Sequence, residues 1–219
     1  MSTTTDKPTL AVIGGTGMLG LGLARRLAAA GYPVIIGSRT AEKATEAASQ
    51  LAGSAKGATN ADAAKAASVV IVTVPWANQA PILDEIKPHV AGKLVVDTTV
   101  PLVPPKVARV QLPPETSAAL AAQKRLGEGV RVVSAFHNVA AHKLQKDEPI
   151  DCDILVFGDS PQDREVVVAL ADAAGLRGIH AGPLANSVAA EALTSVLIGI
   201  NRNYKVDGAG LRITGIATK

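Results

Sequence analysis

The sequence is poor in several kinds of feature, and each shortage excludes a class of protein. Cys152 is the only cysteine among 219 residues, so no disulfide can form within the chain, and its neighbours Asp151 and Asp153 disfavour a nucleophilic thiolate. Aromatic residues make up 2% of the chain, too few for the stacking platforms that bind single-stranded nucleic acid. The absence of any run of 18 apolar residues argues against a membrane span.

Neither the charged residues nor the potential metal ligands form a pattern that indicates a binding partner. The net charge of +3 is small and the basic residues are dispersed, so we expect no nucleic-acid partner. The four histidines and the single cysteine show no metal-ligand spacing, and we expect no metal site. Residues 1–8 hold no apolar stretch of the kind found in secretory signals. Together with the single cysteine, this predicts a cytoplasmic protein.

The most informative segment is a glycine-rich turn. Apolar residues 10–13 precede it, an alanine- and leucine-rich run follows it, and a second apolar strand begins at residue 34. A strand, glycine turn, helix and strand within about 30 residues typically bind a dinucleotide at the helix N-terminus. We expect Gly15 to allow the sharp turn, Gly17 to admit the pyrophosphate, and Gly20 to let the helix pack on the strand. The alternative is a glycine turn without a ligand. The predicted cofactor-binding residues here are Gly15, Thr16, Gly17, Met18, Leu19 and Gly20.

The end of the second strand lacks the acidic residue that binds the ribose 2′-hydroxyl of NAD. Ser38 and Arg39 stand there instead, and Lys43 follows. Hydroxyl and cationic groups suit a 2′-phosphate, which a carboxylate would repel. The sequence therefore predicts NADP(H) as the cofactor. The alternative is that both cations are solvated charges at the start of a surface helix.

Strands and helices alternate along the rest of the chain, which predicts an α/β fold: a Rossmann-type, doubly wound, mostly parallel sheet with a small C-terminal helical segment. We divide the chain into an NADP-binding domain, 1–182, and a C-terminal segment, 183–219, that closes a second-substrate site. We expect further strands at 69–74, 93–97, 131–136, 153–157 and 177–180, with a loop or short edge strand at 52–60 and a proline-rich loop at 98–116. We expect helices at 40–51, 62–67, 78–90, 117–126, 161–174 and 187–204.

Ligands of such sheets bind at the carboxyl ends of the strands. We therefore expect five strand ends to converge on one crevice, at Gly14, Arg39, Pro75-Trp76, Thr98-Thr99 and His137-Asn138. Thr98 and Thr99 either bind cofactor hydroxyls or cap a turn. Trp76 either walls the nicotinamide pocket or packs in the core.

Two further positions carry polar chemistry. His137 either positions a substrate or moves a proton, or it is a buried histidine satisfied by the backbone. Asn138 has the amide needed to hold a carboxamide or a ring carbonyl. Glu191 lies in an otherwise apolar helix, and we expect it to face solvent.

Several stretches together resemble the NADPH-dependent oxidoreductases of the deazaflavin coenzyme F420. They lie in family order over nearly the whole chain, at 14–20, 37–39, 74–76, 134–137, 182–187 and 191–194. The resemblance implies hydride transfer between NADP(H) and coenzyme F420, stacked face to face, in a homodimer. The apolar residues Val196, Leu197 and Ile198 offer a candidate interface; the alternative is that this helix packs on the chain's own sheet.

The resemblance also assigns residues. It places Thr16, Ser38, Arg39 and Lys43 at the 2′-phosphate, with Pro75 and Trp76 along the NADP cleft, and His137, Asn138 and Val139 against the deazaflavin. Val74 and Thr98, at the ends of neighbouring strands, are also predicted to bind the cofactor. The chain departs from the family pattern at 100–105 and 138–141, on the second-substrate side. The alternatives are an NADP-dependent reductase of another small acceptor, such as an imine, a carbonyl or another ring cofactor, and a non-catalytic NADP-binding sensor.

Overall fold

Six parallel strands form the central sheet in the order β3-β2-β1-β4-β5-β6. The computed structural model describes residues 7–216, so residues 1–6 of the predicted N-terminal domain and residues 217–219 of the predicted C-terminal segment lie outside the described residues. The predicted Rossmann-type sheet is confirmed, and the expected edge strand forms as β3. The strands are β1 Leu10–Ile13, β2 Val34–Ser38, β3 Lys56–Thr59, β4 Val69–Val72, β5 Leu94–Asp97 and β6 Arg131–Ser134.

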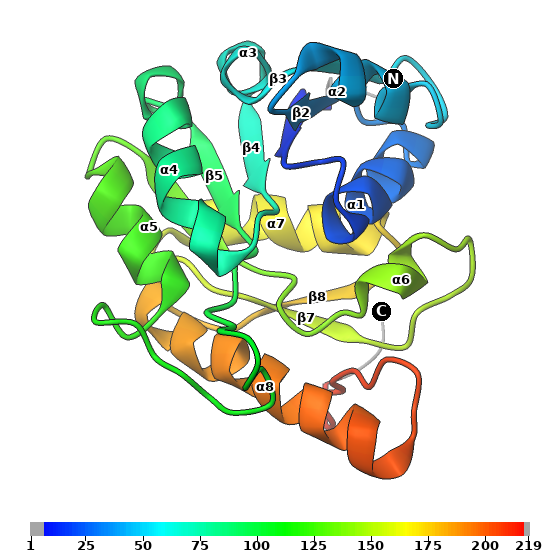
Figure 1. Ribbon diagram of the computed structural model, residues 1–219, viewed down its shortest axis with the longest axis vertical. Coiled ribbons are helices and arrows are strands. Elements are labelled where there is room, and N and C mark those ends of the chain that lie inside the picture. Colours follow the sequence, from blue (N-terminus) through cyan, green and yellow to red (C-terminus); the bar gives the residue numbers. More distant parts are fainter. Residues whose placement is uncertain (1–6, 217–219) are drawn as a thin grey trace.

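Helices cover both faces of this sheet, which explains why the central strands read as unbroken apolar runs (Figure 1). Alternate residues of β1 point to opposite faces: Leu10 and Val12 pack with α1, α2 and α7, whereas Ala11 and Ile13 pack with α3, α4 and α5. The helices are α1 Met18–Ala29, α2 Ala41–Ala48, α3 Asn60–Ala66, α4 Trp76–Ile86, α5 Ala118–Leu126, α6 Ala141–Leu144, α7 Pro161–Ala173 and α8 Ser187–Tyr204, with 3-10 turns η1 Lys87–His89 and η2 Leu184–Asn186.

Two of the predicted strands form outside the main sheet. Strands β7 Asp153–Val156 and β8 Arg177–His180 pair in parallel as a separate two-stranded sheet. An antiparallel bridge joins them to the edge of β6, where Ser134 and Phe157 exchange backbone hydrogen bonds of 2.8 and 2.9 Å. Phe157, directly after β7, runs antiparallel to β6, so β7 is not a seventh parallel strand of the main sheet.

Local chemistry shifts several predicted boundaries. Helix α3 begins at Asn60, two residues before the predicted start, because the Thr59 hydroxyl accepts a 3.2 Å hydrogen bond from the Asp62 N–H. Helix α4 begins at Trp76, directly after Pro75, and gives way to η1 after Ile86. Strand β6 ends at Ser134 rather than 136.

The C-terminal part runs back across the molecule. Helix α8 packs against α5, and the segment after it returns to β7, where the Asp153 N–H donates to the Leu211 carbonyl at 2.7 Å (Figure 1). By length and composition alone, the segment Leu184–Tyr204 is apolar enough to cross a membrane. Polar side chains interrupt this segment, so it contains no run of 18 consecutive apolar residues.

Candidate active site

The glycine turn leads from β1 into α1, and its geometry explains each glycine. Gly14 adopts φ +71°, in the left-handed region, so the turn depends on Gly14 as well as on Gly15, for which the sequence predicts this role. A Cβ on Gly15 would lie 2.6 Å from the Val12 carbonyl oxygen. A Cβ on Gly20 would lie 2.8 Å from the Cα of Gly15, so the expected close packing at Gly20 is present.

The N-terminus of α1 is open to an anion. Its cap residue, Gly17, supplies no side-chain hydrogen bond, and the first turn holds no acidic residue. A Cβ on Gly17 would meet nothing closer than 3.4 Å, so the space beside it is free for a ligand. The first N–H groups of a helix have no partner within it, and the helix dipole is positive there. The turn therefore fits a pyrophosphate, as the sequence predicts.

A cavity of about 450 Å³ adjoins this turn. Thr16 and Gly17 line one side of it, and Ser38 and Arg39 line it at the end of β2. Arg39 is exposed, whereas the Ser38 side chain is buried. The remaining lining residues are Gly14, Asn60, Thr73, Val74, Pro75, Asn78, Pro81, Ile82 and Glu85.

Eight of the predicted cofactor-binding residues lie outside the lining of the cavity: Gly15, Met18, Leu19, Gly20, Lys43, Trp76, Thr98 and Val139. Lys43 is exposed on α2, one turn after Arg39. Met18 and Leu19 are the first residues of α1, and Met18 is exposed. Their backbone N–H groups belong to the open helix end, whereas their side chains do not enter the cavity wall.

Asn60 is a site residue that sequence reasoning missed. Its side-chain Oδ1 accepts a hydrogen bond from the Gly14 N–H at 3.3 Å, and the residue is fully buried against the cavity. This contact holds the glycine turn from α3, which packs against β1 and β2. The signal available in the sequence was the Thr59-to-Asp62 capping pattern, which marks a helix start at a strand's carboxyl end.

Trp76 lies on the other side of α4 from the cofactor cavity. It lines a separate groove of about 610 Å³ between α4 and α5, together with Gln79 and the ion pair of Asp84 and Arg125. The structure therefore does not place Trp76 with the glycine turn, although its neighbour Pro75 is there. The first turn of α4 directs the two residues to different sides.

The end of β5 uses its hydroxyl groups within the protein. The Thr98 hydroxyl donates to the Val72 carbonyl at 2.9 Å, and the Thr99 hydroxyl donates to Asp97 Oδ1 at 2.7 Å. Gln79 donates to Asp97 Oδ2 at 2.7 Å. Burial raises the pKa of Asp97 to about 6, although the hydrogen bonds from Thr99 and Gln79 act to lower it. Thr98 and Thr99 thus connect the carboxyl ends of β5 and β4 beside the cavity, and they do not line the cavity.

His137 is buried just beyond β6. Its Nε2 lies 2.9 Å from the Ser134 hydroxyl, and its Nδ1 has no hydrogen-bond partner among residues 7–216. Burial lowers the pKa of His137 to about 3, so the imidazole is neutral at physiological pH. Its partner is thus a side chain rather than the backbone. The Thr194 hydroxyl on α8 donates to the His137 carbonyl at 2.8 Å.

Asn138 and Val139 connect this turn to the core and to β7. Asn138 donates from Nδ2 to the Asp153 carbonyl at 2.7 Å and to Cys152 Sγ at 3.2 Å, and its Oδ1 has no partner among residues 7–216. Val139 is buried in the core with Leu144 and Cys152. Burial raises the pKa of the Cys152 thiol, which agrees with the prediction that it is not a nucleophile.

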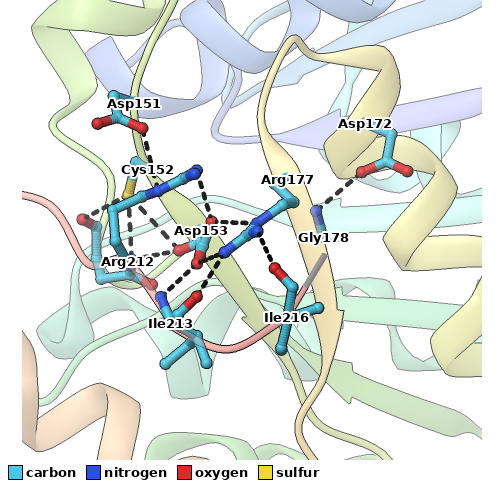
Figure 2. A network of polar contacts seen from close by, with 10 residues as sticks. Asp151, Cys152, Asp153, Asp172, Arg177, Gly178, Arg212, Ile213 and Ile216 are labelled. Atoms are coloured by element: carbon cyan, nitrogen blue, oxygen red, sulfur yellow. Dashed lines mark hydrogen bonds and ion pairs between the residues drawn. The ribbon is translucent and has the colours of Figure 1, made fainter. Parts of the chain in front are cut away.

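The Asp153 carboxylate anchors the C-terminal segment (Figure 2). It accepts hydrogen bonds from Arg177 Nε at 2.7 Å, Arg212 NH1 at 3.0 Å and the Ile213 N–H at 2.6 Å. Burial alone would raise the pKa of Asp153, but the hydrogen bonds from Arg177 and Ile213 lower it below the ordinary value. The segment after α8 is thereby fixed to the strand that Asn138 contacts.

Glu191 does not face solvent as predicted, because its carboxylate is buried against the N-terminus of α5. Its Oε2 accepts from the Ala118 N–H at 2.6 Å and its Oε1 accepts from the Ala119 N–H at 3.2 Å. Burial raises the pKa of Glu191 to about 7, with the nearby Asp97 charge adding to the rise. A carboxylate at a helix N-terminus is stabilised there, which explains a charge on the packed face of α8.

Comparison with known proteins gives consistent matches. The family model for coenzyme F420-dependent NADP oxidoreductases matches residues 9–101. The F420-dependent NADP reductase of Methanothermobacter thermautotrophicus is 44% identical over 220 residues, covering 94% of this chain and 95% of the relative. The corresponding protein of Methanocaldococcus jannaschii is 42% identical, with coverage of 94% and 98%.

Solved structures agree with the fold. One from Arthrobacter sp. FB24, provisionally described as an F420-dependent NADP reductase, has a TM-score of 0.79 and 25% identity, covering 94% of this chain and 99% of that one. An imine reductase of Myxococcus stipitatus has a TM-score of 0.63 and 23% identity, covering 91% of this chain and 61% of that one. The second likeness shows the fold alone.

Proposed function

This chain belongs to the F420-dependent NADP reductase family, and we infer that it transfers a hydride between NADP(H) and the deazaflavin coenzyme F420. The single observation that carries this is the identity of 44% along nearly the whole chain. When bound, the two ring systems supply the two-electron chemistry, so the protein contributes binding, orientation and exclusion of water. The residue assignments that follow are parts of the same proposal.

The glycine turn and the end of β2 hold NADP(H). The N–H groups at the start of α1 bind the pyrophosphate, and Asn60 keeps the turn in place through the Gly14 N–H. Ser38 and Arg39 bind the 2′-phosphate, supported by their position on the same cavity as Thr16. Lys43, exposed one turn farther along α2, contributes a weaker point charge.

His137 and Asn138 face the deazaflavin. Two observations support this: each has one buried polar atom, Nδ1 and Oδ1, that no described residue satisfies. Buried polar groups are ordinarily hydrogen-bonded, so these atoms are the available partners for a ring carbonyl or ring N–H. The neutral imidazole orients the ring and does not serve as an imidazolium acid.

The C-terminal segment, 183–219, closes the second-substrate side, and α8 forms the interface of a homodimer. The Asp153 anchor supports the first statement, because it ties residues 212 and 213 to the strand beside Asn138. Val196 on α8 supports the second, because it is 47% exposed, whereas its neighbour Leu197 is buried within this chain. The single buried cysteine is in keeping with a cytoplasmic protein.

A panel of acceptors tests the function. The purified protein is mixed with NADPH and, in turn, oxidised F420, a flavin and a cyclic imine, with NADH in place of NADPH as the cofactor control. Turnover with F420 and NADPH supports the proposal. Turnover with the imine alone indicates the other-acceptor alternative, and tight NADPH binding without any turnover indicates a sensor.

A further inference from the structure

Three polar side chains follow one face of α8, at Ser187, Glu191 and Thr194. Their spacing of four and then three residues places them on the same side of the helix. Ser187 and Glu191 are fully buried, which costs free energy unless each polar group finds a partner. Each does: the Ser187 hydroxyl donates to Ser117 Oγ at 3.0 Å, and Glu191 and Thr194 make the contacts described above.

The Glu191 contact completes the start of α5. The Ser117 hydroxyl caps that helix by accepting from the Leu120 N–H at 3.1 Å. The two preceding N–H groups, of Ala118 and Ala119, donate to the Glu191 carboxylate. A residue 73 positions away in the sequence thus satisfies N–H groups that a helix cannot satisfy itself. The hydrogen bonds are directional and charge-assisted, so they fix the rotation of α8 more closely than apolar packing would.

The start of α5 is also connected, through Gln79, to the carboxyl end of β5. Gln79 on α4 donates from one amide nitrogen to the Ala118 carbonyl at 3.1 Å and to Asp97 Oδ2 at 2.7 Å. Asp97 ends β5, next to the threonines beside the cofactor cavity. A continuous series of hydrogen bonds therefore connects α8, through the start of α5, to the carboxyl end of β5.

Thr194 extends the same face to the candidate active site. Its hydroxyl holds the carbonyl of His137, within the turn that also carries Asn138. From these contacts we propose that Glu191 is a positioning residue: by fixing α8 on α5, it lets Thr194 hold the His137 turn in place for the second substrate. The kinetic consequence rests on the proposed function, whereas the structural consequence rests on the contacts alone.

Substitution of Glu191 tests the proposal. Glu191→Gln keeps the side-chain length and one acceptor, but it removes the charge and turns an NH₂ group toward a helix N-terminus. We expect the KM for oxidised F420 to rise roughly tenfold, as for loss of a charge-assisted hydrogen bond, with the Kd of NADPH unchanged. Hydrogen–deuterium exchange is expected to become faster at 134–140 and 187–196, and to stay unchanged at 10–39.

Three further variants sharpen the test. Thr194→Val removes the hydroxyl and is expected to reproduce the KM and exchange changes at the His137 turn, while Thr194→Ser retains the hydroxyl and is expected to restore the wild-type values. Glu46→Gln, on the exposed side of α2, is the matched control and is expected to change neither. If Glu191→Gln does not fold, the Thr194 pair carries the same comparison.

Unchanged exchange at 134–140 in both Glu191→Gln and Thr194→Val would overturn the proposal. So would an equal loss of NADPH and F420 affinity, because a merely structural role affects both sides of the cleft. A wild-type protein that does not reduce F420 contradicts the proposed function instead, and the exchange measurements then still decide whether Glu191 positions the turn.

Discussion

Ser134 Oγ lies 2.9 Å from His137 Nε2, and both side chains are buried where β6 ends. Phe136, between them, adopts φ +67°, a left-handed conformation that is rare for a bulky residue. The turn folds the imidazole back onto the serine three residues earlier, and Nδ1 of the ring has no partner within residues 7–216. Strained backbone of this kind is found where the surrounding structure holds a functional residue in place.

Ser134→Ala is expected to lower kcat and leave the Kd of NADPH unchanged. Losing one hydrogen bond of about 1 kcal/mol predicts a fall in kcat of roughly three- to tenfold, because the imidazole is no longer held in one orientation. Steady-state kinetics with F420 as acceptor measure the effect. Ser54→Ala, in an exposed loop, is the control. An unchanged kcat would show that the serine does not orient His137 for the reaction.

The depressed pKa of His137 makes stability depend on pH in a defined direction. From pH 6.5 downward the unfolded chain protonates this residue, whereas the folded chain does so only at about pH 3, so acid lowers the free energy of unfolding. Between pH 7.5 and 5 this amounts to about 2 kcal/mol, which His137→Asn is expected to abolish. Urea unfolding of both proteins at the two pH values gives the difference. A stability difference that does not change with pH would show that His137 keeps its ordinary pKa in the folded state.

Arg39→Gln is expected to weaken NADPH binding more than Lys43→Gln does. Arg39 lines the cavity and presents a planar fork for phosphate oxygens, whereas Lys43 stands outside the lining. We expect a loss of roughly tenfold or more for Arg39→Gln and a smaller loss for Lys43→Gln, with NADH affinity nearly unchanged in both. Calorimetric titration with the two cofactors measures this. Equal losses for NADPH and NADH would remove Arg39 from the 2′-phosphate site.

The two arginines on Asp153 are expected to differ in their contribution to stability. Arg212 is 40% exposed in its side chain, so Arg212→Gln is expected to cost about 1 kcal/mol or less in free energy of unfolding. Asp153→Asn leaves the more buried Arg177 without its charge partner and is expected to cost about 3 kcal/mol or more. Urea unfolding compares them, with Arg202→Gln on the exposed part of α8 as control. Equal effects of Arg212→Gln and Asp153→Asn would mean that the anchor does not depend on the buried pair.

The nucleotide-binding half was predictable because its signals are local. The glycine turn, the apolar runs of β1 and β4 and the residues after β2 are each contiguous in sequence, and the structure places them around one cavity. Which glycine needs a positive φ was not predictable at that level. Gly14 carries it, and its N–H donates to Asn60, at the start of a helix that is distant in the sequence.

The second-substrate side was less predictable because its contacts join distant segments. Glu191 read as a solvent-facing charge, since nothing near it in sequence reveals the N–H groups of α5 that hold it. Trp76 and Pro75 are neighbours in sequence, yet the first turn of α4 sends them to different sides. Strands β7 and β8 were located correctly, but only the Ser134–Phe157 bridge reveals that they leave the main sheet.

Rapid mixing of the purified protein and NADPH with oxidised F420, followed by stopped-flow absorbance, tests the central claim most directly. Hydride transfer predicts a fast loss of the deazaflavin absorbance band together with that of NADPH, in equal amounts, and a much slower loss when NADH replaces NADPH. An unchanged deazaflavin band, under conditions where NADPH is shown to be bound, would contradict hydride transfer to F420.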